Sequence, residues 1–440
     1  MRRAAGGPTC TIGAVTSTRR PSAIRALGAA TALLLLVVAC SPNAPTATPG
    51  PTPTDRPTAT VAPSGTPVDP AAVYGAIEDE VVAIRGLEPK ARLVPTVLDE
   101  ATLRANLAAQ FDKDNKPQDV ASDERLLRAL GLLEPGVSLR DAYLDLQGGQ
   151  VIGYYSPDDD ALFVVSRSGT LGPTERTTFA HEFTHALQDQ HFDLKGLGTD
   201  DVSNGDRALA RVALVEGDAT VTQTEWMLAH LTGDEIAQLI AEASDPAVLA
   251  ALARAPAILR ETSLFPYQDG ATLVNTLRAG GDWAAVNAAF GSPPDSTEQV
   301  LHPTAYVAHE PPVDVAVPEA AASFGAGWTV SREDTLGELL LRIWLSQNGV
   351  RGVDAIAASA GWGGDRVVVL EAAGDRFALG LDTAWDRGAD ADEFAAAART
   401  AIAGQAFGRV VAPTTRRVIV LIAGDADALE RLGGLYGVSG

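Results

Sequence analysis

His181-Glu182-Phe183-Thr184-His185 places two histidines four residues apart, with a glutamate directly after the first of them. In an α-helix, residues four apart lie on the same face, so both imidazoles can bind one metal ion. Glu182 is one position further round the helix, where its carboxylate can take a proton from a water molecule on the open side of the metal. The stretch therefore predicts a Zn²⁺ site with His181 and His185 as ligands and Glu182 as the general base.

The residues around this stretch favour a helix over about 175–190. Thr174, after Pro173, is the expected N-cap, and Glu175 suits the first turn of a helix. Apolar residues recur at intervals of three and four, namely Phe179, Ala180, Phe183, Ala186 and Leu187. We therefore expect an amphipathic helix that carries the metal-binding face.

A catalytic zinc ion usually takes three protein ligands and keeps a fourth position for water. The first candidate for the third ligand is Glu216, in a helix expected to run from Asp206, its N-cap, to about Ala229. Glu216 shares a face with apolar residues, and a carboxylate in such a place is costly unless a cation meets it. Gly217, beside it, allows another helix to approach closely.

His191 is the second candidate for the third ligand. It completes the spacing HExxHxxGxxH, which is the metzincin pattern, but Gln188 stands where that pattern needs a glycine to turn the chain. A helix that continues instead would carry His191 away from the metal. We expect Glu216, and His191 stays the alternative.

The beginning of the chain looks like a bacterial lipoprotein signal. A basic lead and the apolar run 26–39 end in small residues before Cys40, and the resemblance implies cleavage before Cys40 and its lipidation. An uncleaved signal anchor and an ordinary secretory peptide are the alternatives. Residues 41–70 are mostly Pro, Thr, Ala and Ser, which cannot bury a core, so we expect a tether there.

Composition narrows the chemistry and the partners. The only cysteines are Cys10, inside the signal, and Cys40, the expected lipidation site at its end, so we expect neither an internal disulfide nor a thiolate ligand in the mature domain. The formal net charge is −22 at pH 7, and so acidic a surface repels phosphate groups. We therefore expect no nucleic-acid partner, and attachment to the membrane through the lipid alone.

The hydrophobic pattern predicts an α+β fold. We expect a helical N-terminal subdomain over 71–146, a catalytic core over 147–315 and a small α+β region over 316–440. Residues 150–155 and 161–165 should form a β-hairpin. The strand 161–165 is either an edge strand that pairs with an extended substrate or an ordinary core strand.

Several stretches together resemble bacterial gluzincin-type zinc metallopeptidases: Gly153–Tyr155, His181–Asp193, Leu214–Ala219, Thr297–Pro303 and Gly361–Arg366. The resemblance implies a zincin-like core, with His181, His185 and Glu216 as zinc ligands and Glu182 as the base. Thermolysin-like members carry an aspartate four residues after the ligand glutamate, whereas Thr220 stands here.

Two further roles stay open at this point. Asp218 or Asp189 could replace the missing aspartate and orient a ligand histidine. Hydrolysis of an amide also needs a donor to the oxyanion of the tetrahedral intermediate, and His302 and Tyr306, in a proline-rich stretch, are the candidates.

Taken together, the sequence predicts a membrane-anchored, extracytoplasmic lipoprotein that hydrolyses peptide bonds with zinc. One alternative is a non-catalytic lipoprotein that binds peptides or a surface polymer on a degenerate peptidase fold, although the intact Glu182 argues against it. Another is a hydrolase of peptidoglycan amides.

Overall fold

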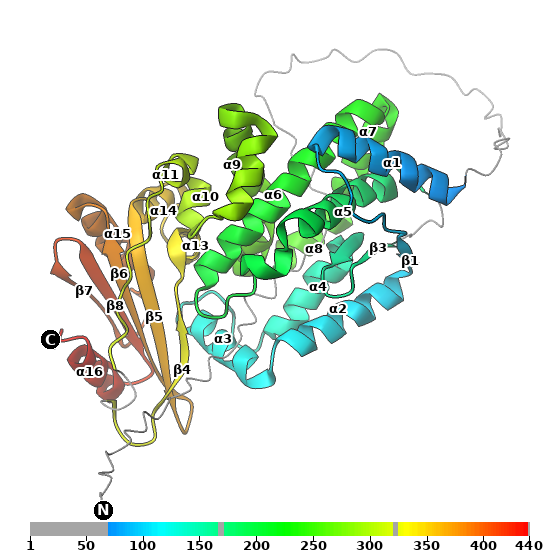
Figure 1. Cartoon of the computed structure of the whole chain (residues 1–440). Coiled ribbons are helices and arrows are strands. Elements are labelled where there is room, and N and C mark those ends of the chain that lie inside the picture. The colour runs from blue at the N-terminus through cyan, green and yellow to red at the C-terminus, as the bar shows by residue number, and fades with distance from the viewer. Residues whose placement is uncertain (1–68, 166–170, 320–323, 439–440) are drawn as a thin grey trace, which may run out of the picture.

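The computed structural model describes residues 69–165, 171–319 and 324–438. The predicted signal peptide, the lipidation at Cys40 and nearly all of the tether lie outside these residues. The fold is mixed α+β: helices and a small sheet make up one half of the molecule, and a larger sheet makes up the other (Figure 1).

The N-terminal part is mainly helical, as expected. Its elements are α1 Pro70–Arg85, β1 Thr96–Leu98, α2 Glu100–Asp114, α3 Pro117–Ala129 and α4 Leu139–Gln150. Asp69, Asp99 and Ser138 cap α1, α2 and α4 by accepting hydrogen bonds from backbone N–H groups of the first turn. The three-residue strand β1 was not expected from the sequence, and α4 continues past residue 146, where we expected the helical subdomain to end.

The predicted hairpin is present as β2 Gly153–Ser156 and β3 Ala161–Val165. The strand β3 also pairs with β1, in parallel, so the sheet has the order β1-β3-β2. The suggestion that 161–165 is an edge strand is therefore wrong, because β1 covers its second side. The edge next to the HExxH helix belongs to β2.

The two helices that carry the predicted ligands lie side by side. The HExxH helix, α5, runs over Pro173–Phe192, and α6 runs over Gly205–His230. Both N-caps differ from the prediction. Gly172 is the N-cap of α5 because Pro173 occupies the first helical position, and Asn204, whose side chain accepts from the Arg207 N–H, caps α6.

A long helical segment, α9 Ala257–Gly291, packs along α6, and it is interrupted by a kink at Gly281 and Asp282, whose backbone is not helical. A Cβ atom on Gly217 would lie 2.3 Å from the backbone of Gly270, and one on Gly270 would lie 2.1 Å from the carbonyl oxygen of Ala213. Only glycine fits at this crossing, so the two backbones touch there, directly beside Glu216.

Shorter helices complete this half of the molecule: η2 Leu194–Leu197, α7 Gly233–Ala243, α8 Pro246–Arg254, α10 Thr297–Leu301 and α11 Pro303–Val307. Among the described residues, no single helix has the length and apolar character to cross a membrane, and only the bent pair α7 and α8 meets that test jointly.

The C-terminal part is an antiparallel five-stranded sheet with helices on both faces (Figure 1). The strands are β4 Thr329–Asp334, β5 Trp362–Ala372, β6 Arg376–Trp385, β7 Gly408–Thr414 and β8 Arg417–Ala423, in the order β4-β5-β6-β8-β7. The helices are α13 Gly337–Gln347, α14 Gly352–Ser359, α15 Gly388–Ala401 and α16 Ala426–Leu435.

The two faces of this sheet bury alternate residues. Val367 and Val369 of β5 belong to the large core that also holds α13 and α15, whereas Val368 and Leu370 pack on the other side with α16. The large core continues into α6 and α9. The C-terminal sheet is thereby packed against the helices that hold the candidate metal site.

Candidate metal centre

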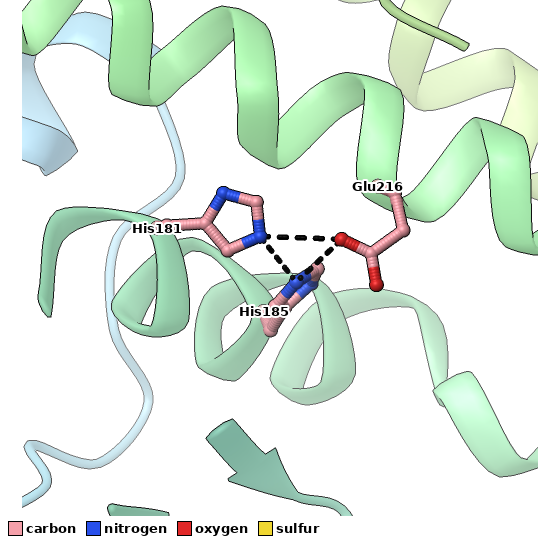
Figure 2. Close-up of side chains that lie close together, drawn as sticks. All are labelled: His181, His185 and Glu216. Carbon is pink, nitrogen blue, oxygen red and sulfur yellow. Dashed lines mark hydrogen bonds and ion pairs between the residues drawn. The ribbon is translucent and has the colours of Figure 1, made fainter. Parts of the chain in front are cut away.

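His181 and His185 lie on one face of α5, and Glu216 faces them from α6 (Figure 2). The Nε2 atoms of the two histidines are 3.0 Å apart. Oε2 of Glu216 lies 3.2 Å from Nε2 of His181 and 3.3 Å from Nε2 of His185. All three side chains are buried. The structure thus brings together the three residues predicted as metal ligands.

The arrangement needs a cation. Nδ1 of His181 lies 3.2 Å from the amide oxygen of Gln223, and Nδ1 of His185 lies 2.8 Å from that of Gln188. An amide oxygen accepts a hydrogen bond, so each imidazole carries a proton on Nδ1 and directs Nε2 toward the other ring and the carboxylate. Two lone pairs and a carboxylate meeting in a buried place require a positive charge between them.

The pKa values of Glu216, His181 and His185 are all shifted by burial and by their mutual contacts. Burial alone would raise the pKa of Glu216, but the charge and hydrogen bonds of the two histidines outweigh it and lower the pKa to about 2. Burial lowers the pKa of His181. Burial also acts to lower the pKa of His185, but the charge of Glu216 overcomes it and raises the pKa to about 9.

The donor set and its dimensions suit a metal ion. His181, His185 and Glu216 each offer one ligand atom, close enough to share one ion. Two ligands about 2.05 Å from a tetrahedral zinc ion lie about 3.3 Å from each other, by the geometry of a tetrahedron. The three separations here, 3.0, 3.2 and 3.3 Å, are close to that length. These three residues could therefore hold a metal ion.

Glu182 is also buried on α5, next to the ligands. Glu182 directly follows His181 in the chain, and its charge contributes to the raised pKa of His185. A Cβ atom added to Gly153, the first residue of β2, would lie 3.5 Å from Cγ of Glu182. Glu182 is therefore located between the ligands and the beginning of β2.

The structure favours Glu216 over His191 as the third ligand. Nε2 of His191 lies 2.7 Å from the carbonyl oxygen of Glu88, outside the cluster. The continuation of α5 past Gln188 is the reason, because no turn brings His191 back toward the metal-binding face.

Asp218 and Asp189 differ in their relation to the ligands. Asp218 accepts a hydrogen bond from Nε2 of Gln188, whose oxygen faces His185, so it reaches that ligand through one residue. Asp189 accepts from the Tyr155 hydroxyl and from the backbone N–H of Leu194. Of the two, Asp218 supports a metal ligand, and Asp189 ties α5 to β2.

His302 and Tyr306 have partners elsewhere. His302 lies at the junction of α10 and α11, and its Nε2 is 3.0 Å from Oε1 of Glu338 on α13. The Tyr306 hydroxyl donates to the carbonyl oxygen of Ser292. Thr297, at the start of α10, donates a hydrogen bond to Asp206, at the start of α6. Asp206 is roughly 15 Å along α6 from Glu216, so α10 packs at the far end of this helix from the metal ligands. The role of these two residues as oxyanion donors stays a prediction.

Four residues of this site were not identified from the sequence. Gln188 and Gln223 follow His185 and Glu216 by three and seven residues, and this helical spacing was the available signal. The ring of Tyr267, on α9, stacks on His181 with centroids 6.1 Å apart. Neither Tyr267 nor Arg85, which pairs with Asp218, has a local pattern that points to the metal.

Buried acids gather where α6, α10 and α13 meet. Burial, together with the charges of Glu338 and other nearby acids, raises the pKa of Glu298 to about 9. Burial raises the pKa of Asp365 to about 6 and that of Asp206 well above its ordinary value. Folding therefore favours the protonated forms, and the stability that they contribute is lost as the pH rises through these pKa values.

We expect Glu298→Gln to stabilise the protein at pH 9 and not at pH 4. Glutamine keeps the shape and cannot ionise. Wild-type Glu298 ionises near pH 4.5 in the unfolded chain and near pH 9 in the folded protein, so the wild type loses stability between these two pH values. Thermal unfolding should show a melting temperature higher by roughly 3 °C or more at pH 9, corresponding to about 1 kcal/mol. Glu134→Gln, on an exposed residue, is the control. An equal shift at both pH values would contradict the prediction.

Comparison with known proteins reaches only the C-terminal part of the chain. A family model described as a domain of unknown function, DUF8575, matches residues 327–432. No curated protein and no solved structure is significantly similar to the chain. The matched segment begins just before β4 and ends in α16, so it includes neither α5 nor α6.

Proposed function

We propose that this protein is a zinc-dependent metallopeptidase with a zincin-like core and the gluzincin-type ligand set His181, His185 and Glu216. The observation that supports it most is the meeting of two imidazole nitrogens and one carboxylate oxygen within 3.0–3.3 Å, next to the buried Glu182. Two histidines and a glutamate are a donor set of catalytic zinc sites.

His181, His185 and Glu216 would hold the zinc ion, which would supply a Lewis acid and lower the pKa of a bound water toward neutral. Glu182 takes the proton of the attacking water and passes it to the leaving amine. Because Glu182 is buried, no bulk water competes for that proton, and electrostatic interactions with it are strong. Gly153 brings the edge strand β2 close to Glu182, so an extended peptide bound along β2 would present its backbone to the base.

Tyr267 is our candidate for the donor to the oxyanion. It comes from α9, on the His181 side of the cluster, whereas β2 approaches from the side of Glu182. We expect Tyr267→Phe, which keeps the stacked ring, to lower kcat roughly 100-fold while the zinc content stays the same.

His302→Gln and Tyr306→Phe, compared with Tyr267→Phe in the same peptide assay, decide between the donors. Unchanged kcat in both would agree with their hydrogen bonds to Glu338 and Ser292. A large loss of kcat in either one, with Tyr267→Phe fully active, would make that residue the donor instead.

The place of action also belongs to this proposal. Lipidation of Cys40 would anchor the enzyme to the membrane outside the cytoplasm, and residues 41–70 would hold it away from the bilayer. The substrates would then be peptides or proteins of the cell envelope, and the acidic surface disfavours nucleic acids.

The test is hydrolysis of a mixed peptide library by the purified full chain. We expect activity that a chelator removes and that added zinc restores. Casein and purified cell wall, assayed in parallel, distinguish a peptidase from a hydrolase of peptidoglycan amides. Zinc binding without turnover of any substrate would instead support a non-catalytic binding protein.

A further inference from the structure

A buried arginine from the first described helix lies behind the metal centre. Arg85 is the last residue of α1, and its side chain is fully buried. A cation is favourable at the C-terminal end of a helix, but a guanidinium removed from water needs strong partners. Those partners are in α6 and α9.

Arg85 holds both oxygens of Asp218. Its Nε donates to Oδ1 at 2.7 Å, and its Nη2 donates to Oδ2 at 3.0 Å. Such a two-pronged pair restricts the carboxylate to one orientation. The Trp283 ring, whose centroid is 4.5 Å from Cζ of Arg85, covers the guanidinium. Asp218 is therefore a rigid acceptor.

That acceptor determines which way the amide of Gln188 points. Nε2 of Gln188 donates to Oδ2 of Asp218 and to the carbonyl oxygen of Val215, both at 2.9 Å. A carboxylate and a carbonyl can only accept hydrogen bonds, so the NH₂ group must face them and the amide oxygen must face His185. Nδ1 of His185, 2.8 Å away, then carries the proton, and Nε2 keeps the lone pair that a metal needs.

We propose that Arg85 is a positioning residue for the metal ligand His185 and acts through Asp218 and Gln188. This inference rests on the proposed zinc function. Without the rigid pair of Arg85 and Asp218, the carbonyl oxygen of Val215 would be the only fixed acceptor of the Gln188 NH₂ group, so the amide would turn over more easily and present its NH₂ group to His185. The proton would then move to Nε2, where it competes with the metal.

The second ligand has a looser arrangement. His181 contacts the oxygen of Gln223 at 3.2 Å, longer than the 2.8 Å contact of His185. The hydrogen-bond network that fixes a ligand is therefore the one around His185, and α1, the helix that follows the predicted tether, takes part in it through Arg85. Residues of α1, α5 and α6 thus act together to orient His185.

The test uses the double variant Arg85→Met/Asp218→Asn of the full chain. Replacing Arg85 alone would leave a buried carboxylate without its cation, whereas the double variant removes both charges together. Asparagine can present either its oxygen or its nitrogen to Gln188, so only the carbonyl oxygen of Val215 still favours one orientation of the Gln188 amide. We expect the zinc affinity, measured by competition with a chromophoric chelator, to fall about 10- to 100-fold.

A second readout follows the proton on His185. In zinc-loaded protein with ¹⁵N-labelled histidine, the Nδ1–H of His185 should give a slowly exchanging NMR signal. We expect this signal to exchange faster in the double variant. Gln188→Met, which keeps the pair of Arg85 and Asp218, should weaken zinc binding to a similar degree.

The matched control is Arg332→Met/Asp123→Asn. This change removes another buried arginine–aspartate pair, 3.2 Å apart, between β4 and α3. It also removes the ion pair of Arg332 with Asp334, whose carboxylate keeps the hydrogen bonds from the backbone N–H groups of Gly205 and Thr335. We expect it to lower the melting temperature and leave the zinc affinity unchanged. Equal loss of affinity in the control, or unchanged affinity in either test variant, would overturn the role of Arg85. Wild-type protein that binds no zinc would contradict the proposed function itself.

Discussion

Replacing Glu182 with glutamine should abolish peptide hydrolysis without loss of the metal. Glutamine has almost the same size and lies at the same buried position on α5, but it cannot accept a proton from water. General-base catalysis contributes about 10²- to 10⁴-fold, so we expect kcat to fall at least about 100-fold. Zinc content by elemental analysis and hydrolysis of a peptide substrate, measured on the same preparation, check this.

The control is Glu134→Gln, which makes the same chemical change at an exposed position. We expect full activity there. A Glu182→Gln protein that binds zinc and retains activity within about tenfold of the wild type would exclude Glu182 as the base.

Replacing Glu216 with glutamine should abolish both zinc binding and activity. The change removes the negative charge that faces the two imidazoles at 3.2 and 3.3 Å and leaves a neutral ligand in its place. Zinc at 100 times its dissociation constant stabilises a folded protein by about 2.7 kcal/mol, which corresponds to roughly 5 °C in melting temperature. We expect wild-type protein to show this rise when zinc is added to the chelated form.

The Glu216→Gln protein should show no such rise, and elemental analysis should find less than one zinc ion in ten molecules. Glu134→Gln again serves as the control and should respond as the wild type does. If Glu216→Gln bound zinc as tightly as the wild type, Glu216 would not be a ligand, and His191 or another residue would have to replace it.

The sequence predicted the features that depend on neighbouring residues. The helix over 175–190 and the hairpin of β2 and β3 follow from apolar spacing and turn residues, and both are present. His181 and His185 share a face because four residues make about one helical turn, so no other part of the chain is needed to align them.

Features set by distant parts of the chain were predicted less well. The strand 161–165 is central because β1, only three residues long and more than 60 residues earlier, pairs with it. Asp206 is not the N-cap of α6 because it turns inward, where it accepts hydrogen bonds from the N–H and hydroxyl of Thr297. Such partners lie far away in the sequence and leave no periodic pattern.

The candidate site divides in the same way. By itself, the sequence determined that His181, Glu182 and His185 lie on one helix and that Glu216 is a candidate third ligand. Only the tertiary structure decided between Glu216 and His191, because that choice depends on the contact of α6 with α9 at Gly217 and Gly270 and on the packing of α6 against α5. It also brought Tyr267 and Arg85 to the metal centre. Helical periodicity is a local property of the backbone, whereas contacts between helices depend on how side chains from the whole chain fill one core.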